Sequence, residues 1–578
     1  YLLLAVVLFT SCSKKSPTEI KYIPKDASMV FVVNQKSLNE KLKSGNLTVD
    51  SFINRIKRNT DSSDNKAFAL LEDFRNNGIN FDDNMYLFFV QKGKAFSTPN
   101  NIFNVLGNMS DISKFETYLK NHKDLKGKTI NKGEGFSYII EEESSFSTVA
   151  IAWNKDVVLG TMYQKSPVKF SLDTTGNYEN ANEPSLKKEV ETEIARYFNL
   201  KEQDRLTSIG HFNNMFKEKA DGYLFTTSQG TLSYLKASPI NIPKLGDLLK
   251  DNYSVSYFNF ENGKIVANST SYTSPMLSSI LKKYPSLKIN TASLEKYPSQ
   301  NMNGFLQFAF NTEILNGIVK ELELGGLADN WLSKVGLTTT DIVTALKGEM
   351  NLFVSDFKVE EKEVSYSFGD QVYKNKITAP SANILFTATI GNKVAFTNLM
   401  EKAVLAGFVL KSPDGNYKVA EALQSLQKMY LTVDGDKLVV ASDEAIYKTY
   451  VANTAKTNLS SEILSKIKDK AAAGYINVNS LIAGSITSVN DSTGKRVLTI
   501  LNNNLKYGIF TSDNFDGGAV KSNMEFILAN EKQNSLVSLF NMTSEIVTIM
   551  QEEEKKRKEM CNNYMPQLNN GPSALDGE

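Results

Sequence analysis

Histidine and cysteine side chains are the usual protein ligands of zinc, and histidine is the commonest general base. The chain has two of each: His122, His211, Cys12 and Cys561. Neither histidine has a second His or a Cys near it in the sequence, so the HExxH and paired CxxC motifs are excluded. We interpret His122 as an exposed residue at a helix end and His211 as a helical residue. A site assembled from distant residues stays open.

Serine and lysine at short spacing can supply a nucleophile and its base. Ser465 and Lys468 have the SxxK spacing of penicillin-binding enzymes, and Ser512 begins a Ser-Asp-Asn run like their second motif. No KTG-like strand follows that run, and SxxK spacing recurs at Ser166 and Ser185. We interpret the pattern as a coincidence in a chain rich in Ser and Lys.

Phosphate-binding and carboxylate motifs are also weak. Gly127, Lys128 and Thr129 match the end of a P-loop, but His122 stands where that loop needs Gly. Acidic runs such as Asp82-Asp83 lie beside turn or strand ends, where solvated loop charge is the default interpretation. The sequence therefore predicts no catalytic, cofactor-binding or metal-binding residue. A hydrolase whose site assembles only in three dimensions is kept as an alternative.

The N-terminal segment has the layout of an export signal. An uncharged apolar block, Leu2 to Phe9, is followed by Thr10, Ser11 and Cys12. This resembles the lipobox of bacterial lipoproteins, which implies that Cys12 is diacylated through its thiol and becomes the mature N-terminus. The alternative is an ordinary buried thiol. The block is too short to span a bilayer, so anchoring is expected from lipid alone.

Composition limits the classes of partner. The chain has 578 residues and 41% hydrophobic content, which favours several folded domains over disorder. Its 65 Lys and Arg residues balance 64 Asp and Glu residues, leaving a net charge of +1. Without a net field to attract an anionic polymer, nucleic-acid binding is disfavoured.

The order of strand-like and helix-like segments from about Tyr22 to Tyr284 recurs from about Tyr297 to Met550. Ile23-Pro24 and Tyr297-Pro298 each precede a strand and then a helix. Ser37 and Glu40 have capping-box spacing and predict the start of the first helix. In the second strand, Leu306, Phe308 and Phe310 share a wholly apolar face, whereas Phe305, Gln307 and Ala309 share a mixed one.

Hairpins follow in both stretches. One is expected from Thr148 to Leu159, turning near Asn154, and its counterpart turns at Asp434-Gly435, where an Asp-Gly pair favours a type I′ turn. Between about Gly160 and Gly210 the first stretch has extra sequence. It includes an amphipathic helix with the apolar positions Leu186, Val190, Ile194 and Tyr197.

We therefore expect an α+β fold, in two tandem copies of a module of antiparallel sheets covered by helices. Residues 1–12 form the lipoprotein signal peptide with lipidated Cys12, and 13–21 a linker. Copy 1 covers 22–286 and copy 2 covers 287–550. Residues 551–578 form a charged helix end and a disordered tail.

Aromatic residues line several strands, as at Tyr253, Tyr257, Phe258 and Phe260. Core packing is the first explanation for them, and an exposed aromatic face that holds a glycan, peptide or partner protein is the second. The same two explanations apply to Trp153 and Trp331, with core packing favoured.

The lipobox, the Ile23-Pro24-Lys25-Asp26-Ala27 opening followed by a strand and Asn34, and the tandem layout together resemble Bacteroidota envelope lipoproteins built on a large domain of unknown function. The resemblance covers nearly all of the mature chain and implies an address and an architecture, but no activity. We place the protein on the periplasmic face of the outer membrane.

Three functions remain open from the sequence. The leading hypothesis is a non-enzymatic binding or interaction scaffold, with the membrane as partner through the lipid anchor and an envelope protein or glycan as further partner. The second is a carrier of a small ligand or oligosaccharide in a cleft between the copies. The third is the hydrolase described above.

Overall fold

The computed structural model describes residues 17–48, 51, 77–92, 100–122, 125–144, 146–165, 186–237, 242–299, 301–334, 336–369, 371–413, 416–421 and 429–568. The apolar segment with Cys12, the serines Ser166 and Ser185 and the predicted tail from 569 onward lie outside these residues. The side chains of Trp331 and Cys561 also lie outside the described part.

The strands of the first half form one antiparallel series. In spatial order they are β5 (Asn131–Gly133), β6 (Phe136–Ser144), β7 (Ser147–Trp153), β8 (Val157–Gln164), β4 (Asn100–Met109), β3 (Asn84–Lys92), β1 (Ala27–Asn34), β9 (Gly222–Thr227), β10 (Tyr253–Glu261) and β11 (Lys264–Tyr272). A short strand, β2 (Ile79–Asn80), pairs with the end of β4.

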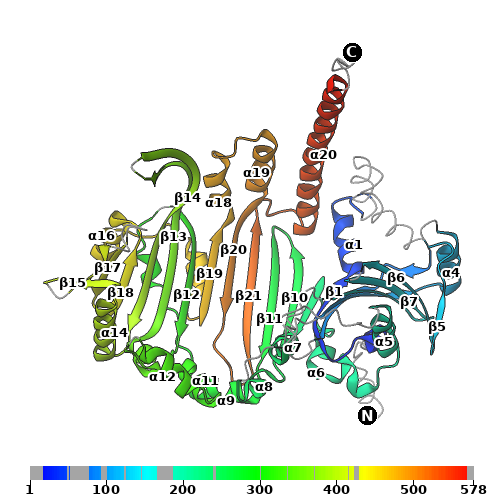
Figure 1. Ribbon diagram of the computed structural model, residues 1–578, viewed down its shortest axis with the longest axis horizontal. Helices are drawn as coiled ribbons and strands as arrows, with labels where there is room; N and C mark the ends of the chain where they lie inside the picture. Colours follow the sequence, from blue (N-terminus) through cyan, green and yellow to red (C-terminus); the bar gives the residue numbers. More distant parts are fainter. Residues whose placement is uncertain are drawn as a thin grey trace, which may run out of the picture.

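The second half continues this series. Its order is β21 (Ala519–Leu528), β20 (Leu505–Ser512), β19 (Ala472–Asn477), β12 (Met302–Phe310), β13 (Leu346–Phe368), β14 (Gln371–Ile390), β18 (Lys437–Ala441) and β17 (Tyr430–Asp434). β11 pairs with β21 along its whole length, from Lys264 opposite Ile527 to Tyr272 opposite Ala519. The predicted α+β class is confirmed, and the two halves share one large antiparallel sheet. β5 and β17 lie at opposite ends of the molecule (Figure 1).

The two halves have the same order of paired strands. Read outward from the β11–β21 pair, the first half runs β11, β10, β9, β1, β3, β4, β8, β7, and the second runs β21, β20, β19, β12, β13, β14, β18, β17. This agrees with the repeated pattern in the sequence. Descent of the halves by duplication stays a prediction.

Helices cover one face of the sheet in both halves. η2 (Glu19–Tyr22), α5 (Leu186–Phe198) and α6 (Gly210–Met215) enclose the first core, with the turns η3 (Glu202–Asp204) and η4 (Leu206–Ser208) beside them. α10 (Ala292–Glu295), α16 (Glu444–Ala452) and α17 (Ser461–Ile467) enclose the second core. The predicted amphipathic helix is confirmed as α5, and its four apolar positions are buried.

Two helix–helix contacts join the halves. α9 (Pro275–Lys283) of the first half packs on α11 (Glu313–Glu321) of the second through Ile280 and Ile314. α20 (Ser535–Leu568) of the second half packs on α1 (Gln35–Ser44) of the first through Val537 and Leu42. The predicted boundary between 286 and 287 lies between α9 and α10. Helices of the two halves therefore pack on each other near both edges of the sheet (Figure 1).

The remaining helices lie mostly along the two edges where strands end. Figure 1 shows α8 (Leu245–Leu249), α11 and α12 (Gly325–Ser333) along one edge, with α18 (Val478–Ile486) and α19 (Ser492–Asn504) along the other. α7 (Gln229–Ala237) contacts β1 and β3, and α13 (Thr339–Ala345) packs against α14 (Lys393–Leu405). A separate hairpin is formed by β15 (Val409–Lys411) and β16 (Tyr417–Val419).

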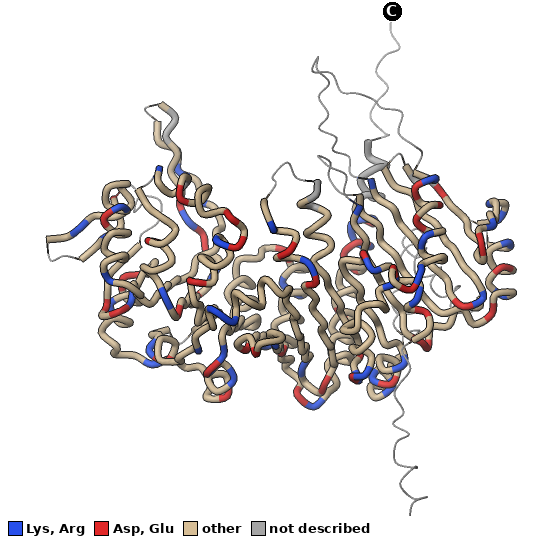
Figure 2. Tube along the Cα trace, turned by 90° about the horizontal axis from the view of Figure 1, so that it is seen from below, with Lys and Arg blue, Asp and Glu red and all other residues tan. Residues whose placement is uncertain are grey.

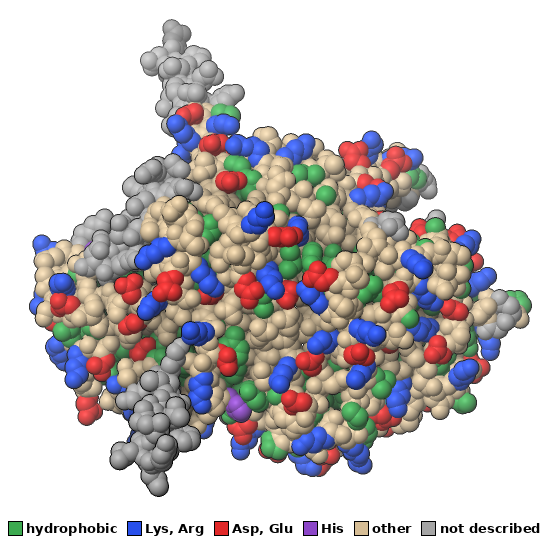
Figure 3. All heavy atoms as spheres, turned by 180° about the vertical axis from the view of Figure 1, so that it is seen from behind, with side chains coloured by type: hydrophobic (Ala, Val, Ile, Leu, Met, Phe, Trp, Pro, Cys, Tyr) green, Lys and Arg blue, Asp and Glu red, His purple; other side chains and the backbone are tan. Residues whose placement is uncertain are grey.

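Positive and negative charges are mixed along the chain. Lys and Arg are interspersed with Asp and Glu along both halves (Figure 2). On the helix-covered side, seen from behind in Figure 3, charged side chains are scattered over the surface. Among the described residues, no helix combines the length and hydropathy needed to cross a bilayer.

Two local predictions are corrected. α1 begins at Gln35 rather than Ser37, because Asn34 caps it by accepting a hydrogen bond from the Ser37 amide (3.1 Å). The β17–β18 hairpin turns at Gly435 and Asp436, one residue later than predicted. Of these two residues only Gly435 has a positive φ (64°), so the turn is not type I′.

Candidate functional site

The serines singled out by their spacing lie on different elements. Ser465 is on α17 and donates to the carbonyl oxygen of Glu462 (2.8 Å), while Lys468 caps the end of that helix. Ser512 ends β20 and accepts a hydrogen bond from Ser522 (3.1 Å). These contacts do not join Ser465 to Ser512.

The two histidines are also far apart in the fold. His122 caps the C-terminal end of α4 (Ile112–Asn121) beside Tyr118 and is partly buried rather than exposed as predicted. His211 lies on α6, as predicted, and stacks on Tyr272 with ring centres 3.7 Å apart. Burial lowers the pKa of the His211 imidazole. In the described ranges, no group of three or more His, Cys, Asp or Glu residues is arranged to hold a metal ion.

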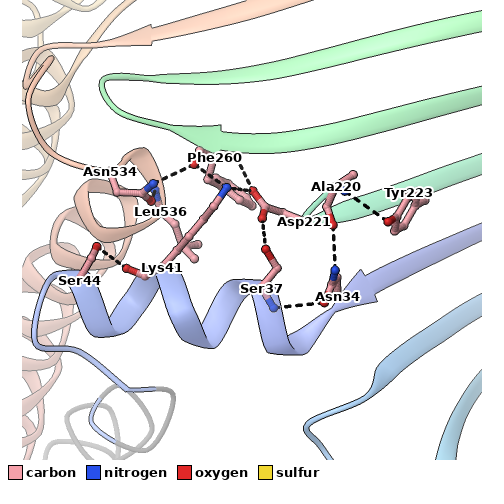
Figure 4. A network of polar contacts seen from close by, with 10 residues as sticks. All are labelled: Asn34, Ser37, Lys41, Ser44, Ala220, Asp221, Tyr223, Phe260, Asn534 and Leu536. Atoms are coloured by element: carbon pink, nitrogen blue, oxygen red, sulfur yellow. Dashed lines mark hydrogen bonds and ion pairs between the residues drawn. The ribbon is translucent and has the colours of Figure 1, made fainter. Parts of the chain in front are cut away.

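Asp221 is the centre of a polar network that the sequence did not single out (Figure 4). Its carboxylate accepts hydrogen bonds from the Ser37 hydroxyl (2.6 Å), from the Lys41 ammonium and from the Phe260 amide (2.6 Å). The Asp221 side chain is 1% exposed and that of Lys41 is 27% exposed. Two donors from α1 and one from β10 therefore converge on a buried carboxylate at the start of β9.

The same network reaches the second half of the chain. The Phe260 carbonyl oxygen accepts hydrogen bonds from the Lys41 ammonium (2.8 Å) and from the side-chain Nδ2 of Asn534 (2.8 Å). Asn534 directly precedes α20. Ser37 and Lys41 both act as donors here, so neither is arranged to take a proton from the other. The geometry is that of a structural junction between α1, β9, β10 and α20, and it is not that of a nucleophile and base.

A second charged cluster joins the halves across the β11–β21 pair. Glu525 of β21 bonds Lys466 of α17 (2.8 Å) and lies 3.5 Å from Lys264 of β11. Burial alone would raise the pKa of the Glu525 carboxyl, but the hydrogen bonds and charges of the two lysines outweigh burial and lower that pKa. Burial likewise acts to lower the pKa of Lys466, which its carboxylate partners nevertheless raise to about 12.

Cavities lie beside the first core. One of about 410 Å³ is lined by Lys25, Asp26, Arg196, Asn199, Leu200, Lys201 and Asp204. The Arg196 guanidinium in this lining is already paired with Asp26 (3.0 Å) and Glu193 (2.8 Å). A larger cavity of about 1000 Å³ opens between the η2 and α6 regions and has a mixed polar lining. Neither brings together a nucleophile and a base through the contacts that the structure records.

The opposite face of the sheet has a different character. Residues that pair across an antiparallel sheet share a face, and neighbours along a strand alternate. One row runs Met85, Val33, Gly222, Phe258, Ala267, Met524, Phe510, Gly474, Leu306, Leu352 and Phe386. We call this side, from β4 to β14, the open face. Up to Ser355 of β13 and Asn383 of β14, none of the strand residues that the pairing registers place on the open face is charged. Beyond these residues the outer β13–β14 hairpin has Glu361, Glu363, Lys374 and Lys376 on this side.

Large apolar side chains on the open face are accessible to solvent. Their exposed fractions range from 36% to 47%, and they are Met29, Leu87, Phe103, Val105, Leu306, Phe308, Leu352, Ile384, Ile476, Phe510 and Met524. In the middle of the sheet, between β12 and β10, no described helix lies in front of the strands (Figure 1). The face is therefore apolar and uncovered over its central part.

Helices do cover the ends of this same side. At one end Phe115 and Leu119 of α4 pack on Trp153 and its neighbours. At the other end Phe396 and Met400 of α14 pack near Leu431 and Leu438. Trp153 is buried, as predicted. The ends of the sheet's second face are therefore covered by helices, while its centre has no cover from the described residues.

The open face was predictable from the sequence only in part. The wholly apolar face of Leu306 and Phe308 was recognised, but the structure buries the mixed face of Phe305, Gln307 and Ala309 instead. On β10 the core-packing explanation is confirmed for Tyr253 and Tyr257, which pack against the first core. Phe258 lies on the open face and is partly exposed, and a partner that covers it stays a prediction. The signal was a wholly apolar face on a strand whose other, mixed face also has large apolar residues.

Comparison with known proteins assigns the chain to a family. The profile of a domain of unknown function, DUF4836, matches residues 20–500, so the chain belongs to that family. The predicted resemblance to proteins built on a large domain of unknown function is thereby confirmed. No curated protein matches the chain.

One solved structure, described as "Structure of crystal form IV of TP0453", is similar at 14% identity. The match covers 47% of this chain and 87% of that chain, with a TM-score of 0.23. At that score the similarity carries no argument about fold or function.

Proposed function

We propose that this protein is a non-enzymatic interaction scaffold of the bacterial cell envelope, whose open face is covered by a partner. The observation that carries the proposal is the row of half-exposed apolar side chains on an uncharged sheet face. The largest apolar patch of a typical monomer is roughly 300–600 Å². A large apolar side chain has roughly 150–200 Å² of accessible surface, so the eleven residues present on the order of 700–900 Å².

The proposed address follows from the N-terminal sequence. We propose a Bacteroidota-type lipoprotein, tethered by acyl chains on Cys12 to the periplasmic face of the outer membrane. The partner is then a component of the envelope, a protein or a glycan. The balanced charge of the chain gives no support to a nucleic acid as partner.

Metabolic labelling tests the tether. Bacteria expressing the full chain are grown with an alkyne-tagged fatty acid, and the purified protein is examined for the tag. We expect the label on the natural chain and on Cys561→Ser, which keeps Cys12, and no label on Cys12→Ser. Equal labelling of the two variants, or none on the natural chain, contradicts lipidation at Cys12.

Site-specific photo-crosslinking tests the scaffold. A photoreactive phenylalanine analogue is placed at Phe308 on the open face or, as control, at Leu405, which is 81% exposed on α14. In intact cells we expect a discrete crosslinked product from position 308 and none from 405. If position 308 gives no product in cells that make the folded protein, the open face has no partner and the proposal fails.

The alternatives have less support. The carrier hypothesis expects a cleft between the copies, but in the described residues the halves meet through the backbone pairing of β11 and β21. The hydrolase hypothesis needs a serine beside a base. Lys132 donates to the Ser137 hydroxyl (2.8 Å). Lys437, which is also paired with Glu349, donates to the Ser293 hydroxyl, so both lysines act as donors. Ser37 donates to a carboxylate held in a structural network.

A further inference from the structure

We infer that the partner of the open face is a second copy of this chain, with the two sheets packed face to face. The inference rests on the proposed function, because it names the occupant of the same surface. Three properties of the open face lead to it: its area, its lack of charge and its breadth.

The area matches what a stable dimer needs. Standard protein interfaces bury roughly 800 Å² on each partner. The eleven exposed apolar residues alone supply on the order of 700–900 Å². Phe258 and Phe526 lie on the same face with smaller exposed fractions and add to it.

The chemistry of the face is self-complementary. A contact between identical surfaces about a twofold axis brings each group near copies of its own surface. A face with carboxylates or ammonium groups would place like charges together, whereas the paired residues of this face are uncharged from β4 up to Ser355 of β13 and Asn383 of β14. From β10 to β20, the polar side chains of this face are hydroxyls, such as those of Ser254, Ser256 and Ser269. A hydroxyl both donates and accepts, so a row of hydroxyls can hydrogen-bond to a copy of itself.

The breadth of the face favours a macromolecule over a small ligand. It extends over the strands from β4 to β14, and at a strand spacing of roughly 4.8 Å this is about 50 Å. Another apolar sheet is the ordinary cover for an apolar sheet, since two such faces pack about 10 Å apart with interdigitated side chains. A second copy of the chain supplies such a sheet.

The mass of the full chain in solution tests the inference. Multi-angle light scattering across a hundredfold range of concentration compares the natural chain with Phe510→Asp and Leu306→Asp. Both positions lie in the central row of the face, and each substitution is present twice in a dimer. We expect the natural chain at twice the chain mass, and at least about 100-fold weaker association for both variants, because each buries two unpaired carboxylates.

The control variant is Leu405→Asp, which adds the same charge at an exposed apolar residue outside the face and keeps the natural N-terminal segment. It should associate like the natural chain. A monomeric natural chain at every concentration overturns the inference, as does equal association of all three variants. Should the Asp variants lose their circular dichroism spectrum, Phe510→Ser replaces them and must weaken association by at least about 10-fold.

The crosslink from position 308 separates this inference from the proposed function. A product that contains this chain alone, at twice its mass, supports the second copy. A product with a different envelope component overturns the second copy and leaves the scaffold proposal intact. The absence of any product removes both.

Discussion

Asp221 shows how one buried charge can join distant parts of a chain. Its partners on α1 and β10 are separated from it by 184, 180 and 39 positions in the sequence. A buried carboxylate is stable only when hydrogen-bond donors replace the water it has lost, and here the donors are a hydroxyl, an ammonium and an amide. The residue holds the first half together at the point where α20 of the second half begins.

Replacing Asp221 by Ala should destabilise the fold by on the order of 3–5 kcal/mol, because Lys41 and the Phe260 amide lose a common acceptor inside the protein. The measurement is the urea midpoint of the full chain, followed by circular dichroism. Glu444→Gln removes an exposed i,i+4 pair with Lys448 and serves as the control, with no change expected. Equal midpoints for Asp221→Ala and the control would show that the network adds no stability.

The sequence could not reveal this network. Asp221 stands in the motif Ala-Asp-Gly-Tyr-Leu, whose counterpart in the second half has Ala473 at the same place. An acid that replaces Ala before a buried strand is a signal, but its partners follow only from the pairing of β9 with β1 and β10. Ser37 was predicted as a helix cap, and the earlier cap at Asn34 left its hydroxyl available for Asp221.

At the scale of elements, helices and strands follow from local patterns, whereas their mutual placement does not. The period of Leu186, Val190, Ile194 and Tyr197 was sufficient to predict α5, because one side of that helix is buried. The strand around Phe308 was also predictable. Which of its faces is covered depends on helices that lie far away in the sequence, so alternation along the strand could not decide it.

The packing of α20 on α1 depends on a close contact at Gly45. A Cβ atom added there would lie 2.5 Å from Cγ1 of Val537, which is buried in the α1–α20 contact. Gly45→Ala should therefore destabilise the fold by roughly 1–3 kcal/mol through overpacking. In the double variant with Val537→Ala the two effects should not add, because the second substitution makes room for the first.

Urea unfolding of the two single variants and the double variant measures this coupling. Gly246→Ala is the matched control, because a Cβ atom at that position meets nothing within 4 Å. Additive effects of Gly45→Ala and Val537→Ala would show that α1 and α20 do not meet at this contact. If Gly246→Ala lost as much stability as Gly45→Ala, the loss would come from replacing a glycine and not from the contact between α1 and α20.

At the scale of the whole molecule, the halves depend on one another. β11 and β21 complete each other's hydrogen bonds, and α9 and α20 each cover a helix of the other half. The recurrence of the same order of strands and helices along both halves was predicted from the sequence. The continuity of the sheet across the halves was not, because pairing between β11 and β21 joins residues more than two hundred positions apart.

Residues 17–286 and 287–568 should therefore fail to fold when produced separately. Each would expose an unpaired strand and an uncovered helix, both of which favour aggregation. Produced together in one cell, they should be soluble and purify as a 1:1 complex through a tag on one of them. A soluble, monomeric half with cooperative thermal unfolding would contradict this interdependence.

The β11–β21 pair also limits growth of the sheet. The corresponding edge strands β11 and β21 pair with each other, as in an isologous contact, and each supplies the backbone hydrogen-bond partners of the other. A head-to-tail arrangement would leave the same type of edge free after every addition and would allow an open-ended filament. Because like edges are used up in the first encounter, a third module of this kind would find no matching edge, and the series closes at two.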